Sequence, residues 1–258
     1  DGLIEEVGYF SSELVQNGNF SELGSEELTN GDFATDSDWS KGTGWVIMNG
    51  YAESDGTNAP LDQFSVLTIG KTYKVVITVT NMTSSALSVR LGTSSSNAIL
   101  SITENGTYTA YGVAGAATFR LRSQGFDGRI QNVSVKQVDP NDRWTLGTGW
   151  SYGDGIVEAN NTSSFFSQSG LIEASKLYKL TFQARLKSGT NGTINAYIGG
   201  SNNQQFTISN TDWQSFTYED TRGSSTADSI YFNNNGTELE LDNISVVEVQ
   251  GDRPRLSY

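Results

Sequence analysis

The sequence predicts an all-β fold of two tandem antiparallel β-sandwich domains, and three observations support this prediction. Short segments alternate apolar and polar residues with a period of two, which is typical of strands that bury one face. Turn-forming pairs such as Asn49-Gly50 and Asn105-Gly106 separate the segments, and glycine supplies 28 of the 258 residues. Several motifs also occur twice at a fixed spacing, which indicates one module in two copies.

The clearest repeat is a glycine-rich segment between two tryptophans. Trp39–Trp45 reads WSKGTGW, and Trp144–Trp150 reads WTLGTGW, 105 positions later. The strand near Tyr73 returns near Tyr178 with the same spacing. A period this long indicates a duplicated domain rather than a solenoid, whose repeats are shorter.

The closing motifs mark the ends of the two copies. NVSV at 132–135 corresponds to NISV at 243–246, 111 positions later, so the second copy is slightly longer. The sequence therefore predicts four segments: a lead-in or linker at 1–26, module one at 27–138, module two at 141–249, and a linker to a following domain at 250–258. We accordingly expect the chain to be a piece of a longer protein.

A shorter repeat lies near the start of the chain. NGNF at 17–20 is followed by NGDF at 30–33, and a spacing of 13 is too short for a domain. We interpret the pair as a small local duplication of two turns that precede strands, because Asn and Gly tolerate positive φ. The alternative is a loop that supplies ligands to Ca²⁺.

The last strand of each module has an irregularity. The apolar residues step from Ile130 to Val133 in module one and from Leu241 to Ile244 in module two, so the period of two fails. A β-bulge, placed at Asp242-Asn243 in module two, would restore the alternation. The same break in both copies indicates a feature of the fold.

Composition excludes several classes of function. The chain has no His and no Cys, so His-based metal sites and His general bases are excluded, and the redox compartment stays undecided. A net charge of −13 argues against binding to nucleic acid or to an anionic membrane, and it is compatible with carboxylates offered to Ca²⁺. No stretch approaches 18 apolar residues, so we expect no membrane insertion.

The motifs, in their order, resemble a known class of domain. NGDF at 30–33, Gly44-Trp45, the strand 73–80 and the closing QNVSV at 131–135 are similar to carbohydrate-binding modules of the jelly-roll, galactose-binding-like class. Module two carries the closing motif as DNISV at 242–246. The resemblance implies that each sandwich is a jelly roll and that its partner is a surface polysaccharide or glycan.

A second resemblance concerns the wider protein. The WxxGxGW repeat is similar to modules of bacteriophage tail-fibre and other virion proteins, and 253–258 resembles the opening of a concanavalin-A-like lectin domain. It implies a location in the virion tail or surface, or outside the cell. It also implies other virion proteins as partners and a possible homotrimer.

The resemblance further implies a structural Ca²⁺ site. Its carboxylates would come from Asp32 in module one and from Asp242 in module two. Neither copy has both, because Gln131 stands where module two has Asp242 and module two lacks an NGDF motif. The alternative is that Asp242 caps the backbone of a bulge.

The alternation also predicts a sugar-binding face. Sugars stack their C–H faces on aromatic rings, while amide and charged side chains bind their hydroxyls. The outward residues of this kind in module two are Tyr197, Tyr231, Asn195, Asn233, Gln183 and Arg185. The corresponding positions in module one are Arg90, Arg120, Ser88, Arg122, Thr78 and Thr80. Module two therefore suits a neutral sugar, and module one suits an anionic partner or none; the alternative is that these are ordinary surface residues of strands.

The tryptophans are expected to have a structural role. The four in the WxxGxGW repeats occupy matched positions in both copies, which packing explains most simply. Trp213, matched by Tyr108, is expected to behave similarly.

The functional hypotheses follow from these features. We expect no enzymatic activity, because the carboxylates are scattered through loops and form no matched pair at strand ends. The first hypothesis is a non-catalytic tail-fibre or receptor-binding segment that adheres to host-surface glycans. The second is a pair of carbohydrate-binding modules appended to a secreted bacterial polysaccharide-degrading enzyme. The third is a ligand-free structural spacer or capsid decoration.

Overall fold

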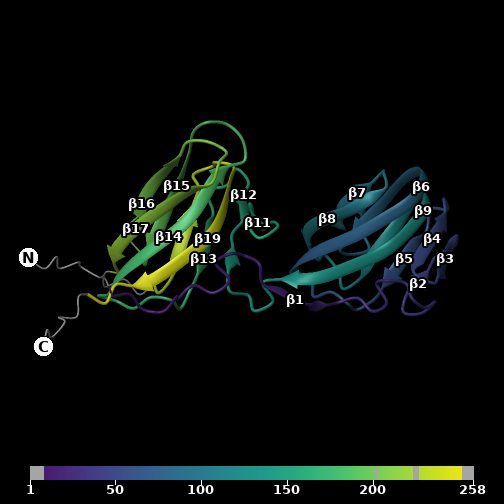
Figure 1. Cartoon of the computed structure of the whole chain (residues 1–258), viewed down its shortest axis with the longest axis horizontal. Helices are drawn as coiled ribbons and strands as arrows, with labels where there is room; N and C mark the ends of the chain where they lie inside the picture. Colours follow the sequence, from purple (N-terminus) through teal and green to yellow (C-terminus); the bar gives the residue numbers. More distant parts are fainter. Residues whose placement is uncertain (1–8, 201–202, 223–226, 252–258) are drawn as a thin grey trace, which may run out of the picture. The chain divides into compact units, whose positions relative to one another are not determined.

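The computed structural model describes residues 9–200, 203–222 and 227–251, which are built mainly of β-strands (Figure 1). Within these residues, the one helix is the short 3₁₀ segment η1 (Ser95–Asn97), and none is long and apolar enough to cross a membrane. The chain divides into two compact units: Leu23–Pro140, and Asp1–Glu22 together with Asn141–Tyr258. We call these units module one and module two.

Module one is an antiparallel sheet that wraps into two layers. Its strands are β1 (Leu23–Glu26), β2 (Ser40–Lys41), β3 (Trp45–Met48), β4 (Tyr51–Asp55), β5 (Pro60–Gln63), β6 (Thr72–Arg90), β7 (Ala98–Ile102), β8 (Gly106–Val113) and β9 (Phe119–Val138). The long strands β6 and β9 pair with different partners along their length. Layer I joins β2, β5 and β7 to the end of β6 and the start of β9. Layer II joins β3, β4 and β8 to the other halves.

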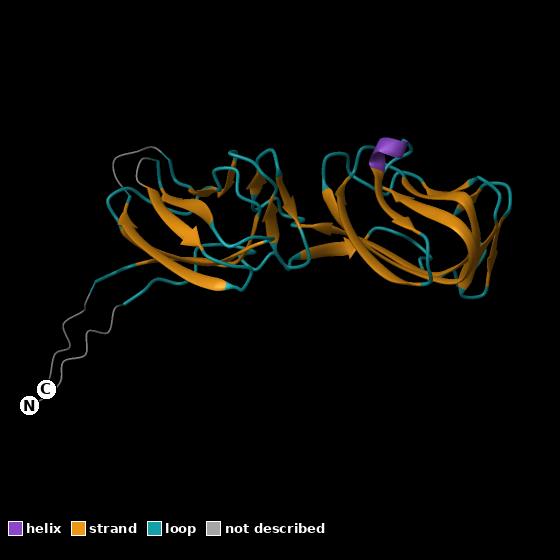
Figure 2. Ribbon diagram, turned by 90° about the horizontal axis from the view of Figure 1, so that it is seen from above, coloured by secondary structure: helices purple, strands orange, loops and turns teal. Residues whose placement is uncertain are grey.

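Module two has the same strand order in two separate sheets. Figure 2 shows that strands joined by loops make up most of the described residues. Its strands are β10 (Thr145–Leu146), β11 (Trp150–Tyr152), β12 (Val157–Ala159), β13 (Phe165–Gln168), β14 (Leu177–Leu186), β15 (Gly192–Ile198), β16 (Asn203–Ile208), β17 (Gln214–Thr221), β18 (Ile230–Asn233) and β19 (Leu239–Glu248). Layer I has the order β10-β13-β18-β15-β16, and layer II has the order β11-β12-β19-β14-β17. All pairs are antiparallel. The predicted fold class, all-β with two jelly-roll sandwiches, is confirmed.

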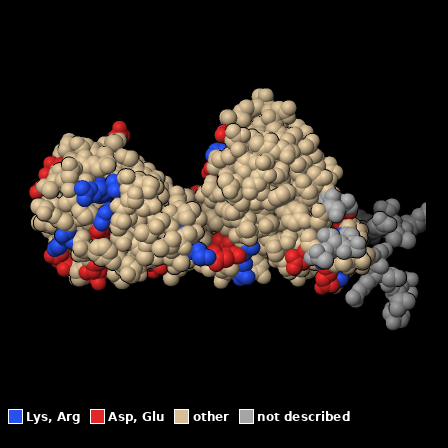
Figure 3. All heavy atoms as spheres, turned by 180° about the vertical axis from the view of Figure 1, so that it is seen from behind, with Lys and Arg blue, Asp and Glu red and all other residues tan. Residues whose placement is uncertain are grey.

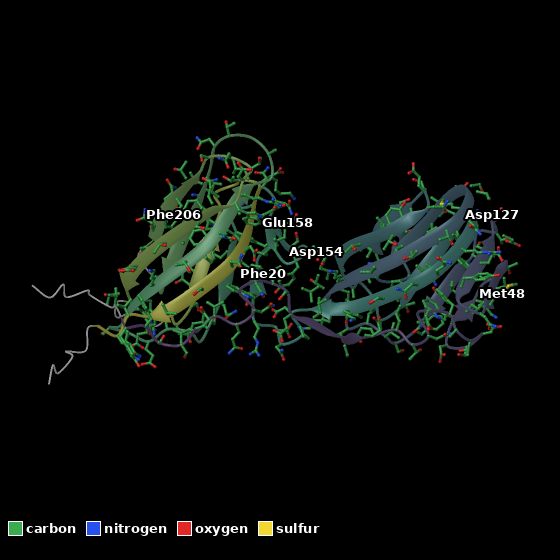
Figure 4. All side chains as sticks on the ribbon, in the orientation of Figure 1. Phe20, Met48, Asp127, Asp154, Glu158 and Phe206 are labelled. Carbon is green, nitrogen blue, oxygen red and sulfur yellow. The ribbon has the colours of Figure 1, made fainter. Side chains whose placement is uncertain are left out.

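The start of the chain belongs to module two. Phe10 forms a bridge with Val249, and the ring of Phe20 is buried with its centroid 5.5 Å from that of Trp144 (Figure 4 labels Phe20). The predicted lead-in at 1–26 is therefore wrong for residues 9–22, and β1 belongs to module one because it pairs with β9. The rest of the lead-in, 1–8, and most of the predicted linker, 252–258, lie outside the described residues.

A pair of glutamates shows that the opening segments of the two modules are equivalent. The carboxylate of Glu13 accepts hydrogen bonds from the Val246 N–H at 2.8 Å and the Ser245 hydroxyl at 2.5 Å. Glu26 does the same in module one with the N–H of Val135 and the hydroxyl of Ser134, both at 2.6 Å. The spacing of 13 thus separates the opening motifs of two modules, and it is not a local duplication.

The Asn-Gly turns dock on the predicted bulges. The Ile244 N–H donates to Gly18 O at 2.9 Å, and the Val133 N–H donates to Gly31 O at 2.9 Å. A Cβ on Gly18 would lie 2.0 Å from Ile244 O, and one on Gly31 would lie 2.2 Å from Val133 O, so only glycine fits. Module two therefore has its own opening motif, NGNF at 17–20, in which Asn19 stands where module one has Asp32, so it lacks the aspartate of NGDF as predicted.

The bulges themselves are confirmed. Thr181 pairs with Ser245 and Gln183 pairs with Asp242, so β19 has one more residue than β14 across this step. The pairing of β6 with β9 slips in the same way in module one, between Thr78 and Val79. The bulge frees one N–H in each closing strand, and the glycine carbonyl accepts it.

The repeated tryptophans are buried, as predicted. Their ring N–H groups donate to backbone carbonyls in matched pairs: Trp39 to Asn30 and Trp144 to Asn17, both at 3.0 Å, and Trp45 to Ala59 at 3.0 Å and Trp150 to Ser164 at 2.9 Å. A buried indole needs such a partner. The prediction that Trp213 behaves similarly is wrong, because Trp213 is only partly buried and the guanidinium of Arg185 lies 4.5 Å from its ring centroid.

Candidate functional site

The outward side of layer I in module two gathers aromatic and amide side chains. Tyr197 on β15 pairs with Tyr231 on β18, and Asn195 pairs with Asn233 on the same two strands. Phe165 on β13 pairs with Asn233 from the other side. Because the neighbouring residues along these strands are buried and apolar, the strand alternation directs this set outward. We call these five residues the aromatic face.

The three rings form one continuous surface. The centroids of Tyr197 and Tyr231 are 5.1 Å apart, and Phe165 lies 5.8 Å from each with its ring nearly perpendicular to both. Phe165 is 50% exposed, whereas the two tyrosines are half-buried. A cluster of partly exposed aromatic rings of this kind is typical of a surface that binds a ligand or another macromolecule.

The tyrosine hydroxyls are held from one side. The Gly200 N–H donates to the Tyr231 hydroxyl at 2.6 Å, and the Asn203 amide donates to the Tyr197 hydroxyl at 3.4 Å. Each hydroxyl therefore keeps its own proton to donate. Burial raises the pKa of Tyr231, the nearby Tyr197 raises it further, and the positive charge of Arg222 offsets part of this rise. Tyr231 is thus a neutral hydrogen-bond donor at physiological pH.

The two asparagines differ in how well they are satisfied. Asn233 donates to Ser163 O, and its side-chain oxygen accepts from the Asn235 N–H at 3.2 Å. Asn195 is 7% exposed, and its Oδ1, which is closed to solvent, accepts no hydrogen bond from any residue that the structure describes. A buried acceptor without a donor costs about 1–3 kcal/mol. A hydroxyl group from a ligand would relieve this cost once a shift of the neighbouring side chains opened the oxygen to it.

None of the described outward positions on the strands of layer I carries a charge, although the cation of Arg222 lies near enough to Tyr231 to lower its pKa. The outward positions of layer I are Thr145, Phe165, Ser167, Tyr231, Asn233, Thr193, Asn195, Tyr197, Asn203, Gln205 and Thr207. This contrasts with the net charge of −13 of the whole chain. In Figure 3, the broad visible surface of module two is mostly free of charged atoms. The ligand that suits such a face is neutral.

Two predicted site residues lie elsewhere. Gln183 and Arg185 are on β14, which belongs to layer II, so the prediction that they join the aromatic face is wrong. Gln183 accepts a hydrogen bond from Asn243 at 2.9 Å, and Arg185 pairs with Glu240. The reason is that alternation separates inward from outward residues but does not say to which layer a strand belongs.

One residue of the face was missed. Phe165 is the most exposed of the three rings, and the sequence held a signal for it. Phe165 and Phe166 are adjacent in one strand, so only one of them can face inward. Phe166 is fully buried, which turns Phe165 outward.

The two predicted calcium ligands belong to different modules. Asp32 is exposed in module one, where it accepts from the Ala34 N–H at 3.3 Å. Asp242 in module two accepts from the N–H of Asn243 at 2.6 Å and from its amide at 3.0 Å, as the alternative of a bulge cap predicts. Among the described residues, no group of three or more acidic, His or Cys side chains could hold a metal ion. The calcium site stays a prediction.

Comparison with known proteins gives structural matches only. No family model matches the sequence, and no curated protein matches it. By contrast, 88 chains of solved structures match. One, titled "CBM4 structure and function", is 19% identical over 39% of this chain and 76% of that chain, with a TM-score of 0.32.

Two further matches carry related titles. The tandem CBM22-1-CBM22-2 domain of Paenibacillus barcinonensis Xyn10C is 9% identical, covers 87% of this chain and 98% of that chain, and has a TM-score of 0.31. The CBM22-1-GH10 modules of Clostridium thermocellum xylanase 10B, complexed with xylohexaose, are 10% identical over 43% of this chain and 26% of that chain, with a TM-score of 0.35. These neighbours are carbohydrate-binding modules, alone or attached to an enzyme, and the likeness is too weak to transfer residue roles.

Proposed function

We propose that module two binds a neutral polysaccharide on its aromatic face and that the chain is a non-catalytic glycan-binding segment. The observation that carries this proposal is the cluster of three adjacent rings, with Phe165 the most exposed, beside the unpaired oxygen of Asn195 on strands whose described outward positions are uncharged.

Each residue has a chemical role in this proposal. Phe165, the most exposed ring, offers its surface to the C–H face of a sugar. Tyr197 and Tyr231 donate their hydroxyl protons to sugar oxygens, and Asn195 accepts from a sugar hydroxyl. A site that pairs a buried polar group with its ligand discriminates strongly against molecules without the matching hydroxyl.

The face suits an extended ligand rather than a single sugar. It runs across four neighbouring strands, from β13 through β18 and β15 to β16, and strands lie about 4.8 Å apart, so the row spans roughly 14 Å. Exposed Gln205 and Asn203 on the edge strand β16 continue the polar lining beside Asn195 and Tyr197. Several weak contacts along one polymer then add to a useful affinity.

The wider role implied by the sequence resemblance is part of the proposal. The chain would adhere to host-surface glycans from a bacteriophage tail fibre, outside the cell and beside other virion proteins. The sequences that flank the chain in its full-length protein test this role. A fibre or lectin-like domain there would support it, whereas a catalytic domain would favour modules of a secreted polysaccharide-degrading enzyme.

The binding experiment uses the whole chain. Affinity electrophoresis against a panel of neutral polysaccharides (β-glucans, xylans, mannans and galactans) identifies a ligand, and calorimetry then measures its affinity. We expect Phe165→Ala and Tyr197→Ala each to weaken binding about tenfold or more, since each removes a stacking surface. Asn195→Ala removes the unpaired acceptor oxygen, and we expect it to weaken binding of the same polysaccharide as well.

Gln183→Ala is the matched control. This residue lies on layer II, so its loss should leave binding unchanged. Retention of full affinity by Phe165→Ala and Tyr197→Ala in a protein that binds would place the site elsewhere. Absence of retention by every neutral polymer, from a folded sample, would overturn the proposal in favour of a ligand-free spacer.

A further inference from the structure

Module one has a basic face where module two has its aromatic face. Arg90 pairs with Arg120, and Ser88 pairs with Arg122, on the end of β6 and the start of β9. These are the same register positions of layer I that hold Tyr197 with Tyr231 and Asn195 with Asn233 in module two. We call Arg90, Arg120 and Arg122 the arginine face. Figure 3 shows a group of basic side chains on the visible surface of module one.

One of the three arginines is already neutralised. Arg120 Nε donates to Asp62 Oδ1 and Nη2 donates to Oδ2, both at 2.8 Å, and Nη1 donates to Thr93 O at 3.1 Å. Asp62 is buried, and both of its oxygens are used by this bidentate pair. Among the residues that the structure describes, neither Arg90 nor Arg122 forms an ion pair with a carboxylate, because Asp62 is taken by Arg120.

Arg90 is a buried cation with few hydrogen bonds. Its side chain is 8% exposed, and its Nε donates a hydrogen bond to Ser88 Oγ at 3.0 Å. Burial lowers the pKa of Arg90, and the positive charges of Arg122 and Arg120 lower it further. Burying a cation beside two other cations is unfavourable unless an anion accompanies it.

We propose that the arginine face binds the anionic group of an acidic polysaccharide, a carboxylate or a sulfate. Guanidinium groups recognise both through paired N–H donors. Arg120, locked by Asp62, forms one wall of the site, and Arg90 and Arg122 supply the unpaired donors. The choice of a polysaccharide rather than another anion rests on the function proposed for module two, whose layer I has the same frame.

The two faces then give one chain two glycan specificities. Module two would take a neutral polymer and module one an acidic one. The whole chain is acidic, with a net charge of −13, so a polyanion would meet general repulsion and bind only where local charge is reversed. Nonspecific adsorption of polyanions is therefore disfavoured.

The test uses the full chain carrying both Phe165→Ala and Tyr197→Ala, which weakens binding at the aromatic face. The probes are polygalacturonate for carboxylate, dextran sulfate for sulfate, and unsubstituted dextran as the neutral control. The measurement is made at about 0.1 M salt, where the Debye length is about 10 Å. Acidic residues farther than this from the arginine face are then largely screened and repel the polyanion little. We expect retention by at least one acidic polymer and not by dextran, and weaker retention at about 1 M salt.

Arg122→Gln is the principal variant, because Arg122 is half-buried and its replacement spares the Arg120–Asp62 pair. We expect about a tenfold loss of affinity, as for one charge-assisted hydrogen bond, and partial rescue by Arg122→Lys. Arg90→Gln should lose more, with thermal unfolding as the check that it folds. Lack of retention by either acidic polymer, or unchanged affinity in both Gln variants, would overturn the proposal.

The two proposals can fail separately. Absence of retention by every neutral polymer would end the proposal for module two and leave the arginine-face result untouched. Retention of dextran sulfate but not polygalacturonate, or the reverse, identifies the anionic group and supports the proposal in either case.

Discussion

Modules one and two share a frame and differ in the chemistry of one face. In module two Tyr197 pairs with Tyr231, and in module one the same register holds Arg90 and Arg120. The strand order and the indole hydrogen bonds are the same in both. The outward positions of layer I can therefore carry different residue types in the two modules. The fold depends instead on contacts that both modules share, such as the hydrogen bonds of the buried indoles.

Those contacts involve the opening segment of each module. Glu13 and Gly18 hold it to the closing strand of module two, and Glu26 and Gly31 do so in module one, with matching partners. The chain therefore supplies the first segment of module two, then all of module one, and then the remainder of module two. A fragment that begins at residue 27 would lack a buried part of module two.

The largest expected effect comes from Phe20→Ala. Phe20 is 2% exposed and packs on Trp144 and Phe166, so its truncation should lower the stability of module two by about 3–5 kcal/mol. Hydrogen exchange followed on peptides from β14 and from β6 separates the two modules. We expect faster exchange in β14 and unchanged exchange in β6.

Phe33→Ala is the mirror experiment. Phe33 is fully buried, 5.2 Å from Trp39 in module one, and its truncation should affect β6 and spare β14. If Phe20→Ala instead destabilised module one, or neither module, the assignment of the opening segment would be wrong.

A smaller effect is expected at the two docking glycines. Gly18→Ala places a Cβ 2.0 Å from Ile244 O, and Gly31→Ala places one 2.2 Å from Val133 O. Such overpacking costs about 1–3 kcal/mol, in module two and in module one respectively. Gly24→Ala is the control, since its nearest neighbour would be 3.5 Å away, and denaturant unfolding measures all three. Equal stability of Gly18→Ala and Gly24→Ala would contradict the docking geometry.

The carboxylate contacts are expected to contribute less. Glu13→Gln keeps one acceptor oxygen and loses the charge that receives the Val246 N–H and the Ser245 hydroxyl. We expect a loss of about 1 kcal/mol in module two, and the same in module one for Glu26→Gln. The two variants should match within experimental error. A large difference between them would show that the frames are less alike than the distances suggest.

Sequence alone predicts what depends on local pattern. Alternation identified inward and outward residues, the failure of the period at Leu241–Ile244 identified a bulge, and repetition identified buried tryptophans. It could not place Gln183 and Arg185, because a strand's layer is decided by its partners and not by its own residues. For the same reason the motif at 17–20 was assigned to the wrong part of the chain: its partner, Ile244, lies more than two hundred residues away.

The smallest expected effect concerns Asp242, whose counterpart in module one is the uncharged Gln131. Burial raises the pKa of Asp242, and the Asn243 N–H offsets part of this rise. The folded module therefore binds this proton more tightly than the unfolded chain. The contribution of Asp242 to stability should increase as the pH falls from neutral through the raised folded-state pKa, and it should level off near the unfolded value of about 3.9.

Asp242→Asn should remove that part of the pH dependence, which appears as the difference between its stability and that of the wild type from pH 7 to 4. Repeating both measurements with Ca²⁺ tests the predicted metal site at the same residue. Stabilisation by Ca²⁺ in the wild type that is lost in Asp242→Asn would support a calcium ligand there. Identical unfolding curves with and without Ca²⁺ would leave Asp242 as a cap of the bulge, where its two bonds to Asn243 already account for its position.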